Sequence, residues 1–99
     1  MSQQIELSVI ILCYRSGEAV VDFIKKAEDL VQTLTDNYEL VLVANYIEGS
    51  DDRTRDYVLK IEKENARCKA LCKPKQGMMG WDMRSGMDAA SGKYICVID

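Results

Sequence analysis

Four apolar runs, separated by stretches with helical spacing, constrain the fold of this 99-residue chain most strongly. The first run, Leu7 to Tyr14, is almost continuously apolar and rich in β-branched residues, which is typical of a strand covered on both faces. Further runs follow at Tyr38 to Val43, Cys68 to Lys73 and Tyr94 to Ile98. Because strands buried on both faces belong to parallel sheets, the runs favour an α/β protein.

Between these runs, apolar residues recur every three or four positions, as in helices with one buried face. The spacing predicts helices over Val20 to Leu34, Thr54 to Glu64 and Met79 to Ala90, with Ser16 as the N-cap of the first. Methionines at every fourth position of the third helix are expected to pack on the sheet. Strand and helix therefore alternate, which predicts a doubly wound, mostly parallel sheet of four strands with three helices on its two faces.

Composition argues against several classes of protein. The formal net charge is −3, whereas nucleic-acid binders usually present a basic face, so no nucleic-acid partner is expected. No run of about eighteen apolar residues and no signal peptide is present, so a cytoplasmic location is expected. The four cysteines occur without any histidine, which favours reduced, buried thiols over a metal or redox role.

The loops after the predicted strands lack two familiar phosphate-binding motifs. A dinucleotide-binding domain needs G-x-G-x-x-G after its first strand, where this chain has only Gly17, and no P-loop sequence occurs. The segments that follow the strands, or lead into the last one, instead form an ordered set: 12–15, 43–45, 49–54, 80–86, 90–94 and 97–99.

In order and spacing, these segments resemble the nucleotide-binding front part of family 2 glycosyltransferases, which have the GT-A fold and include dolichol-phosphate mannosyltransferases. Strands of that family end in Pro-x-Tyr-Asn, in Val-Asp-Asp-Gly-Ser followed by Asp-x-Thr, and in Asp-x-Asp. The resemblance runs from Leu7 to Asp99. It implies the strand order 3-2-1-4, and residues 1–99 would be a partial GT-A nucleotide-sugar-binding domain.

The resemblance also implies a function, transfer of a sugar from a UDP- or GDP-sugar donor to a glycan or lipid acceptor. The general base of an inverting transfer is expected beyond residue 99, so the 99-residue piece by itself is expected to be inactive. The alternative hypothesis is a non-enzymatic, flavodoxin-like signalling or interaction domain. Strand order separates the two hypotheses, because the flavodoxin-like arrangement is 2-1-3-4.

A donor site is implied at the carboxyl ends of the strands. Its predicted nucleotide-binding residues are Tyr14, Arg15, Asn45, Gly77, Gly80, Arg84 and Asp99. Tyr14 would offer a ring face to the nucleobase, although packing at the rim of the sheet is its alternative role. Asn45 stands where the family has an aspartate that accepts a hydrogen bond from the base. Arg15 stands where the family has an asparagine, so the nucleotide stays open between UDP and GDP.

The remaining predicted residues concern the diphosphate. Gly77 and Gly80 would let the backbone approach the ribose or the diphosphate, and Arg84 would pair with phosphate oxygens or, alternatively, with an aspartate of its own helix. Asp99 would be the first acid of the Asp-x-Asp motif. Together with the second acid it would hold Mg²⁺ or Mn²⁺ against the diphosphate, whereas alone it is a polar residue that ends a strand.

The last predicted strand, Tyr94 to Ile98, ends the chain without a covering helix. Apolar edges are normally covered, so the sequence is expected to be the front part of a longer protein. The missing part could carry membrane helices, which would place the enzyme at the cytoplasmic face of a membrane. An open edge would also permit a homodimer through a continuous sheet.

Overall fold

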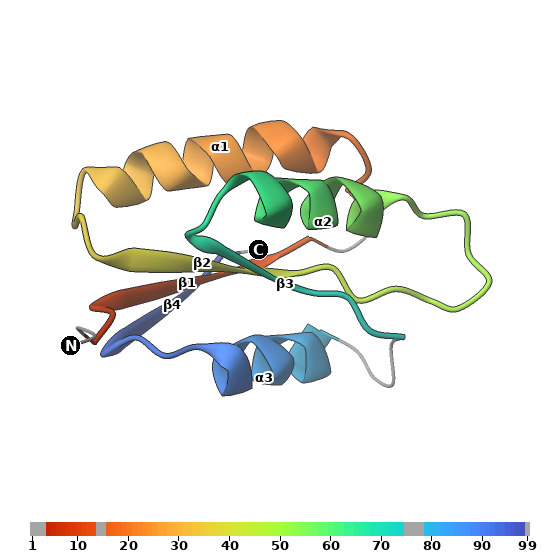
Figure 1. Ribbon diagram of the computed structural model, residues 1–99. Helices are drawn as coiled ribbons and strands as arrows, with labels where there is room; N and C mark the ends of the chain where they lie inside the picture. Colours follow the sequence, from red (N-terminus) through yellow and green to blue (C-terminus); the bar gives the residue numbers. More distant parts are fainter. Residues whose placement is uncertain (1–3, 14–15, 75–78, 99) are drawn as a thin grey trace.

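The computed structural model describes residues 4–13, 16–74 and 79–98 (Figure 1). For Met79, only the backbone is described. Strands and helices alternate along the chain, as the apolar runs predict. The elements are β1 (Leu7–Leu12), α1 (Ala19–Gln32), β2 (Tyr38–Val43), α2 (Thr54–Glu64), β3 (Cys68–Leu71), α3 (Met79–Ala89) and β4 (Tyr94–Ile98).

The four strands form one parallel sheet in the order β3-β2-β1-β4. Leu7 at the start of β1 is in register with Tyr38 of β2 on one side and with Tyr94 of β4 on the other. The predicted order 3-2-1-4 is confirmed, and the order 2-1-3-4 of the flavodoxin-like hypothesis is not found.

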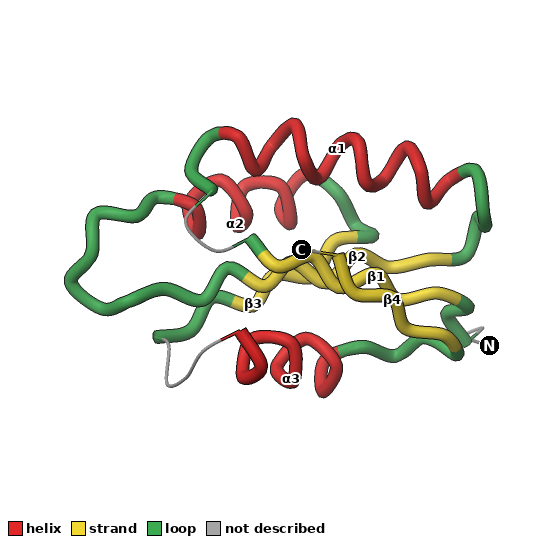
Figure 2. Tube along the Cα trace, turned by 180° about the vertical axis from the view of Figure 1, so that it is seen from behind, coloured by secondary structure: helices red, strands yellow, loops and turns green. Residues whose placement is uncertain are grey.

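Helices cover both faces of the sheet, with α1 and α2 on one face and α3 on the other (Figures 1 and 2). Successive side chains of a strand point to opposite faces, and β1 supplies both layers. Val9 and Ile11 pack in the core under α1 and α2, whereas Ile10 and Leu12 pack in the core over α3. The continuous apolar run in the sequence thus reflects a strand buried on both faces.

Helix α3 lies close to the sheet because Gly86 faces it without a side chain. A Cβ at this position would lie 2.5 Å from Cγ2 of Ile10 and 3.1 Å from Cγ2 of Val43. Met83 packs against the same core, but Met87 is 48% exposed, so the predicted methionine stripe is wrong at Met87. Residues four apart are rotated by about 40° around a helix, so a four-residue repeat drifts off the buried face.

Several predicted boundaries differ from the structure. Strand β1 ends at Leu12 and β3 at Leu71, each two residues earlier than predicted, and α3 ends at Ala89. The N-cap of α1 is Glu18, without a side-chain capping bond, and not Ser16. Gly17 explains the shift, because its φ of +58° turns the chain before α1 begins.

Strand β4 lies at an edge of the sheet, as expected. Tyr94 is 58% and Ile95 is 44% exposed there. The homodimer through Tyr94 to Ile98 stays a prediction. Within the described ranges no helix is long and apolar enough to cross a membrane.

The four cysteines are free thiols. Cys13 and Cys68 are buried and Cys72 is half-buried, as expected for structural thiols, whereas Cys96 on the edge strand is exposed. Burial, and then the neighbouring Cys72, raises the pKa of the Cys13 thiol to about 12. This thiol is therefore protonated and unreactive at neutral pH.

Candidate functional site

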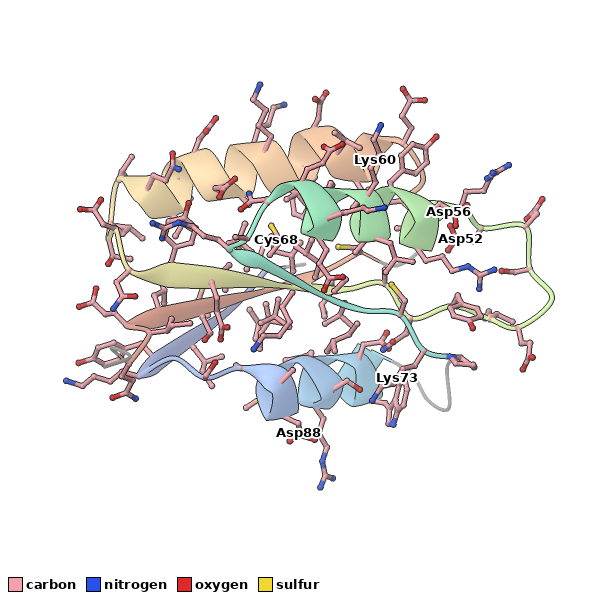
Figure 3. All side chains as sticks on the ribbon, viewed as in Figure 1. Asp52, Asp56, Lys60, Cys68, Lys73 and Asp88 are labelled. Atoms are coloured by element: carbon pink, nitrogen blue, oxygen red, sulfur yellow. The ribbon has the colours of Figure 1, made fainter. Side chains whose placement is uncertain are left out.

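The carboxyl ends of the parallel strands meet at one edge of the sheet, which we call the C-terminal edge. Ligands of open α/β sheets bind at this edge. Of the predicted site residues, Asn45, Gly80 and Arg84 are described. The others, Tyr14, Arg15, Gly77 and Asp99, lie outside the described residues. Figure 3 shows Asp52 before α2 and Lys73 beyond β3 on this side of the molecule.

The chains that leave β2 and β3 stay paired beyond the two strands. The Ala44 amide donates to the Leu71 carbonyl at 2.8 Å, and the Tyr46 amide donates to the Lys73 carbonyl at 3.0 Å. A last bridge joins Tyr46 to Pro74, which has no amide hydrogen. The edge therefore extends two to three residues past the strands as a paired ribbon.

Asn45 lies on this ribbon, with 2% of its surface exposed. Its Nδ2 donates to Oδ1 of Asp82 at 3.0 Å, and its Oδ1 accepts a hydrogen bond from the Lys73 amide at 3.0 Å. Asp82 is also buried, in the first turn of α3, where a negative charge complements the helix dipole. Asn45 thus joins three segments of the C-terminal edge: the end of β2, the chain after β3 and the start of α3.

These contacts bear on the role predicted for Asn45. An amide oxygen has two lone pairs, so one acceptor position remains beside the bond from Lys73, and acceptance from a nucleobase stays a prediction. The buried partner Asp82 was missed as part of the site, because a single acid near a helix start is commonly a solvated first-turn residue. The signal in the sequence is spacing, because Asp82 lies four residues before Gly86 and therefore on the same, sheet-facing side of α3.

Gly80 and Arg84 both lie on exposed positions of α3. Apart from its chain neighbours and the backbone of its own helix, no atom of the described residues would lie within 4 Å of a Cβ at Gly80, so these residues leave open space there. In the described part of the chain, no ion pair joins Arg84 to Asp82 or Asp88, the two aspartates of its helix. Their predicted roles toward a diphosphate stay predictions.

The first turn of α2 forms a second network at the C-terminal edge. The Thr54 hydroxyl donates to Oδ1 of Asp52 at 2.6 Å and accepts a hydrogen bond from the Gly17 amide at 2.7 Å. Oδ1 of Asp52 also accepts from the Thr54 amide at 3.0 Å. Next to Thr54, the guanidinium of Arg55 lies 3.9 Å from the ring centre of Tyr46. The start of α2 therefore contacts both the loop after β1 and the ribbon after β2.

The opposite, N-terminal edge holds a buried carboxylate, Glu39, that is 5% exposed. Its oxygens accept hydrogen bonds from the Ser8 hydroxyl at 2.6 Å and the Ser91 amide at 2.7 Å. Lys69 forms an ion pair with it at 3.1 Å. We call Glu39, Ser8, Ser91 and Lys69 the Glu39 cluster.

Charge and hydrogen bonding in the Glu39 cluster set the pKa of its carboxyl. Burial raises this pKa, but the bonds from Ser8 and Ser91 and the contact with Lys69 outweigh burial, so the pKa of Glu39 is lowered from its ordinary value. Glu39 was not predicted to be special, because a charged residue inside an apolar run is usually a solvent-facing strand residue.

The described residues provide no cluster of metal ligands. Among them, no group of three or more histidine, cysteine, aspartate or glutamate residues could hold a metal ion. The predicted metal ligand, Asp99, is outside this set. The described residues therefore do not form a site for Mg²⁺ or Mn²⁺ on their own.

Comparison with protein families identifies the family of this chain. Residues 8–99 match the model of the family described as glycosyl transferase family 2. The chain belongs to this family. None of the curated proteins with which it was compared matches it. Family 2 membership agrees with the strand order 3-2-1-4 and identifies the domain, at a coarse level, as the nucleotide-sugar-binding portion of a glycosyltransferase.

Proposed function

We propose that the C-terminal edge binds the nucleoside diphosphate of a UDP- or GDP-sugar, and that the complete polypeptide transfers the sugar to a glycan or lipid acceptor. One observation carries this proposal: the bond of 3.0 Å between Asn45 and Asp82. It brings the end of β2 and the start of α3, two segments predicted separately from the sequence, to one place. Family membership supports a sugar-nucleotide donor as the ligand.

Each predicted residue has a chemical role in this proposal. Tyr14 is assigned to stacking on the nucleobase, and Arg15, the next residue in sequence, is assigned to the same nucleotide. Gly77 and Gly80 admit the ribose and diphosphate, and the open space at Gly80 is consistent with that approach. Arg84 is exposed on α3, and its guanidinium pairs with phosphate oxygens.

A divalent cation, Mg²⁺ or Mn²⁺, is proposed for the complete enzyme. This part of the proposal rests on Asp99, since the described residues form no metal site of their own. When bound, such a cation offsets negative charge on a leaving diphosphate.

The catalytic part of the reaction is also proposed for the complete polypeptide. An inverting transfer needs a general base that takes the proton of the acceptor, and we place this base beyond residue 99. We expect the 99-residue chain to bind nucleotide without transferring sugar. A cytoplasmic location, or the cytoplasmic face of a membrane, is proposed for the enzyme.

Calorimetry tests the donor site directly. UDP and GDP are titrated into the chain, with and without Mn²⁺, and the titrations are repeated on Tyr14→Ala and Asp99→Ala. We expect one nucleotide to bind more tightly than the other, and both variants to bind it about tenfold or more weakly. Asp88→Ala is the matched control, because Asp88 is an exposed aspartate near the far end of α3 (Figure 3). If the folded chain binds neither nucleotide, or if Asp88→Ala weakens binding as much as Asp99→Ala, the proposed site is wrong.

A further inference from the structure

The segment Asp52-Arg53-Thr54 matches the Asp-x-Thr of family 2 glycosyltransferases, and it leads into the first turn of α2. Thr54 is 1% exposed, although a threonine at the start of a helix is commonly at the surface. Burial of a hydroxyl is costly unless its hydrogen-bonding capacity is used. The partners of this hydroxyl therefore indicate what it does.

A threonine hydroxyl has one hydrogen to donate, and its direction depends on the strongest acceptor nearby. In this structure the acceptor is the carboxylate oxygen Oδ1 of Asp52, at 2.6 Å. Bonds of this length to a carboxylate are charge-assisted and stronger than neutral ones. The hydrogen is thus committed to Asp52, which leaves a lone pair of the oxygen to face the Gly17 amide at 2.7 Å.

Gly17 is the first turn residue before α1. Its φ of +58° favours glycine, and its carbonyl accepts a hydrogen bond from the Val20 amide at 3.2 Å. On the other side of Tyr14 and Arg15 in sequence, the Cys13 amide donates to the Val43 carbonyl at 2.8 Å. Both chain ends that flank the two predicted donor residues are therefore held, one by the sheet and the other by Thr54.

We propose that Thr54 is a positioning residue for the donor site, and that Asp52 orients its hydroxyl toward Gly17. Thr54 acts through the loop after β1 and does not touch the nucleotide itself. This inference rests on the proposed function, because it assigns Tyr14 and Arg15 to nucleotide binding. It goes beyond that function by placing the control of the β1 loop in the first turn of α2.

Arg55, the residue after Thr54, contacts Tyr46 on the ribbon after β2. A guanidinium 3.9 Å from a ring centre stacks on the aromatic face. Since Tyr46 belongs to the paired ribbon that also carries Asn45, the first turn of α2 holds the loop after β1 and the ribbon after β2 in one arrangement.

The test uses Thr54→Val, which keeps the volume of the side chain and removes its hydroxyl. Affinity for UDP and GDP in the presence of Mn²⁺ is measured by calorimetry, and exchange of the Gly17 amide hydrogen is followed by NMR. We expect affinity to fall about tenfold, and the Gly17 amide to exchange at least tenfold faster. Thr54→Ser, which retains a hydroxyl, should restore both values to within about twofold.

Two further variants keep the test decisive. Thr33→Val is the matched control, because the Thr33 hydroxyl donates to the Leu30 carbonyl at 2.6 Å at the far end of α1. It should leave affinity unchanged. Asp52→Ala removes the orienting acceptor without placing a new group in the interior, so it covers the case in which Thr54→Val does not fold. We expect Asp52→Ala to weaken binding about threefold to tenfold.

The outcomes separate the two proposals. If the unmodified chain binds nucleotide and Thr54→Val, folded, binds it equally well, the positioning role is wrong and the donor site stands. The positioning role is also wrong if Thr54→Val lowers the affinity for nucleotide and Thr54→Ser does not restore it. If the unmodified chain binds neither UDP nor GDP, the proposed function fails, and the positioning role fails with it.

Discussion

The two edges of the sheet hold buried polar groups in different ways. At the N-terminal edge, the Glu39 cluster is closed by strand residues and by the turn into β4, and it includes an ion pair between the buried Glu39 carboxylate and the partly exposed Lys69. At the C-terminal edge, Asn45 and Thr54 bond mainly to loop backbone and to aspartates at helix starts. Polar groups of the first kind hold strands together, whereas those of the second kind hold loops in position.

Because of this difference, we expect variants at one edge to change the stability of the fold and variants at the other edge to change ligand binding. The Glu39 cluster joins the beginnings of β1, β2 and β3 to the turn before β4, because Ser8 also accepts a hydrogen bond from the Gly92 amide at 2.8 Å. A change there should weaken the whole sheet. At the C-terminal edge, the hydrogen bonds of Asn45 and Thr54 fix segments that a ligand would contact, so changes should affect binding more than folding.

The largest effect is expected from Glu39→Ala. It leaves the Ser8 hydroxyl, the Ser91 amide and the ammonium of Lys69 without their shared acceptor. A buried donor left without its acceptor costs about 1–3 kcal/mol, and we expect a loss of about 3 kcal/mol in the free energy of unfolding, because water can solvate the partly exposed Lys69 ammonium but not the buried Ser8 hydroxyl.

Urea unfolding followed by circular dichroism measures this loss. Glu48→Ala, at an exposed glutamate of the long loop after β2, is the control and should change the free energy of unfolding by less than about 0.5 kcal/mol. Nucleotide affinity of the folded Glu39→Ala variant should match that of the unmodified chain. A loss of stability below about 1 kcal/mol would contradict the role given to the cluster.

A smaller effect is expected from Asn45→Asp, which introduces the residue that the family more commonly has. In this chain it places a second carboxylate beside the buried Asp82, at the position of a bond now 3.0 Å long. Like charges at this distance cannot both ionise without cost, and we expect a loss of about 2 kcal/mol in the free energy of unfolding.

The double variant Asn45→Asp with Asp82→Asn exchanges acid and amide. It should recover at least half of the loss, and the four proteins together form a double-mutant cycle. A double variant no more stable than Asn45→Asp alone would mean that the Asn45 and Asp82 side chains are not coupled. Recovery in the double variant would attribute the amide at position 45 to the neighbouring Asp82 carboxylate.

The smallest expected effect is on pH dependence. Because the pKa of Glu39 is lowered in the folded chain, its contribution to stability is present above the ordinary glutamate pKa and is lost as the pH falls through the lowered value. The free energy of unfolding should therefore decrease on acidification below about pH 5. Glu39→Gln should flatten this decrease, and urea titrations at a series of pH values measure it. If the free energy of unfolding fell equally steeply with pH in both proteins, the assignment of this pH dependence to Glu39 would be wrong.

The sequence predicted the architecture well, because periodicity alone separates strands from helices. The bounds of β2, α2 and β4 agree with the prediction residue for residue. The polar interior was predicted poorly. Glu39 lies in an apolar run and Asp82 in an ordinary first turn, and the partners named for them are 30 or more residues away along the chain. Local patterns cannot pair such groups, since pairing depends on the register of the sheet.

The register of the sheet has a consequence for synthesis of the chain. Strand β1 pairs with β2 on one side and with β4 on the other, and Leu7 meets Tyr94. A ribosome that adds about 5–20 residues per second needs roughly 4–17 s to pass from the first to the second of these residues. During that interval β1, a central strand that is buried on both faces in the folded protein, lacks at least one of its two neighbours, so the nascent chain exposes a hydrophobic strand.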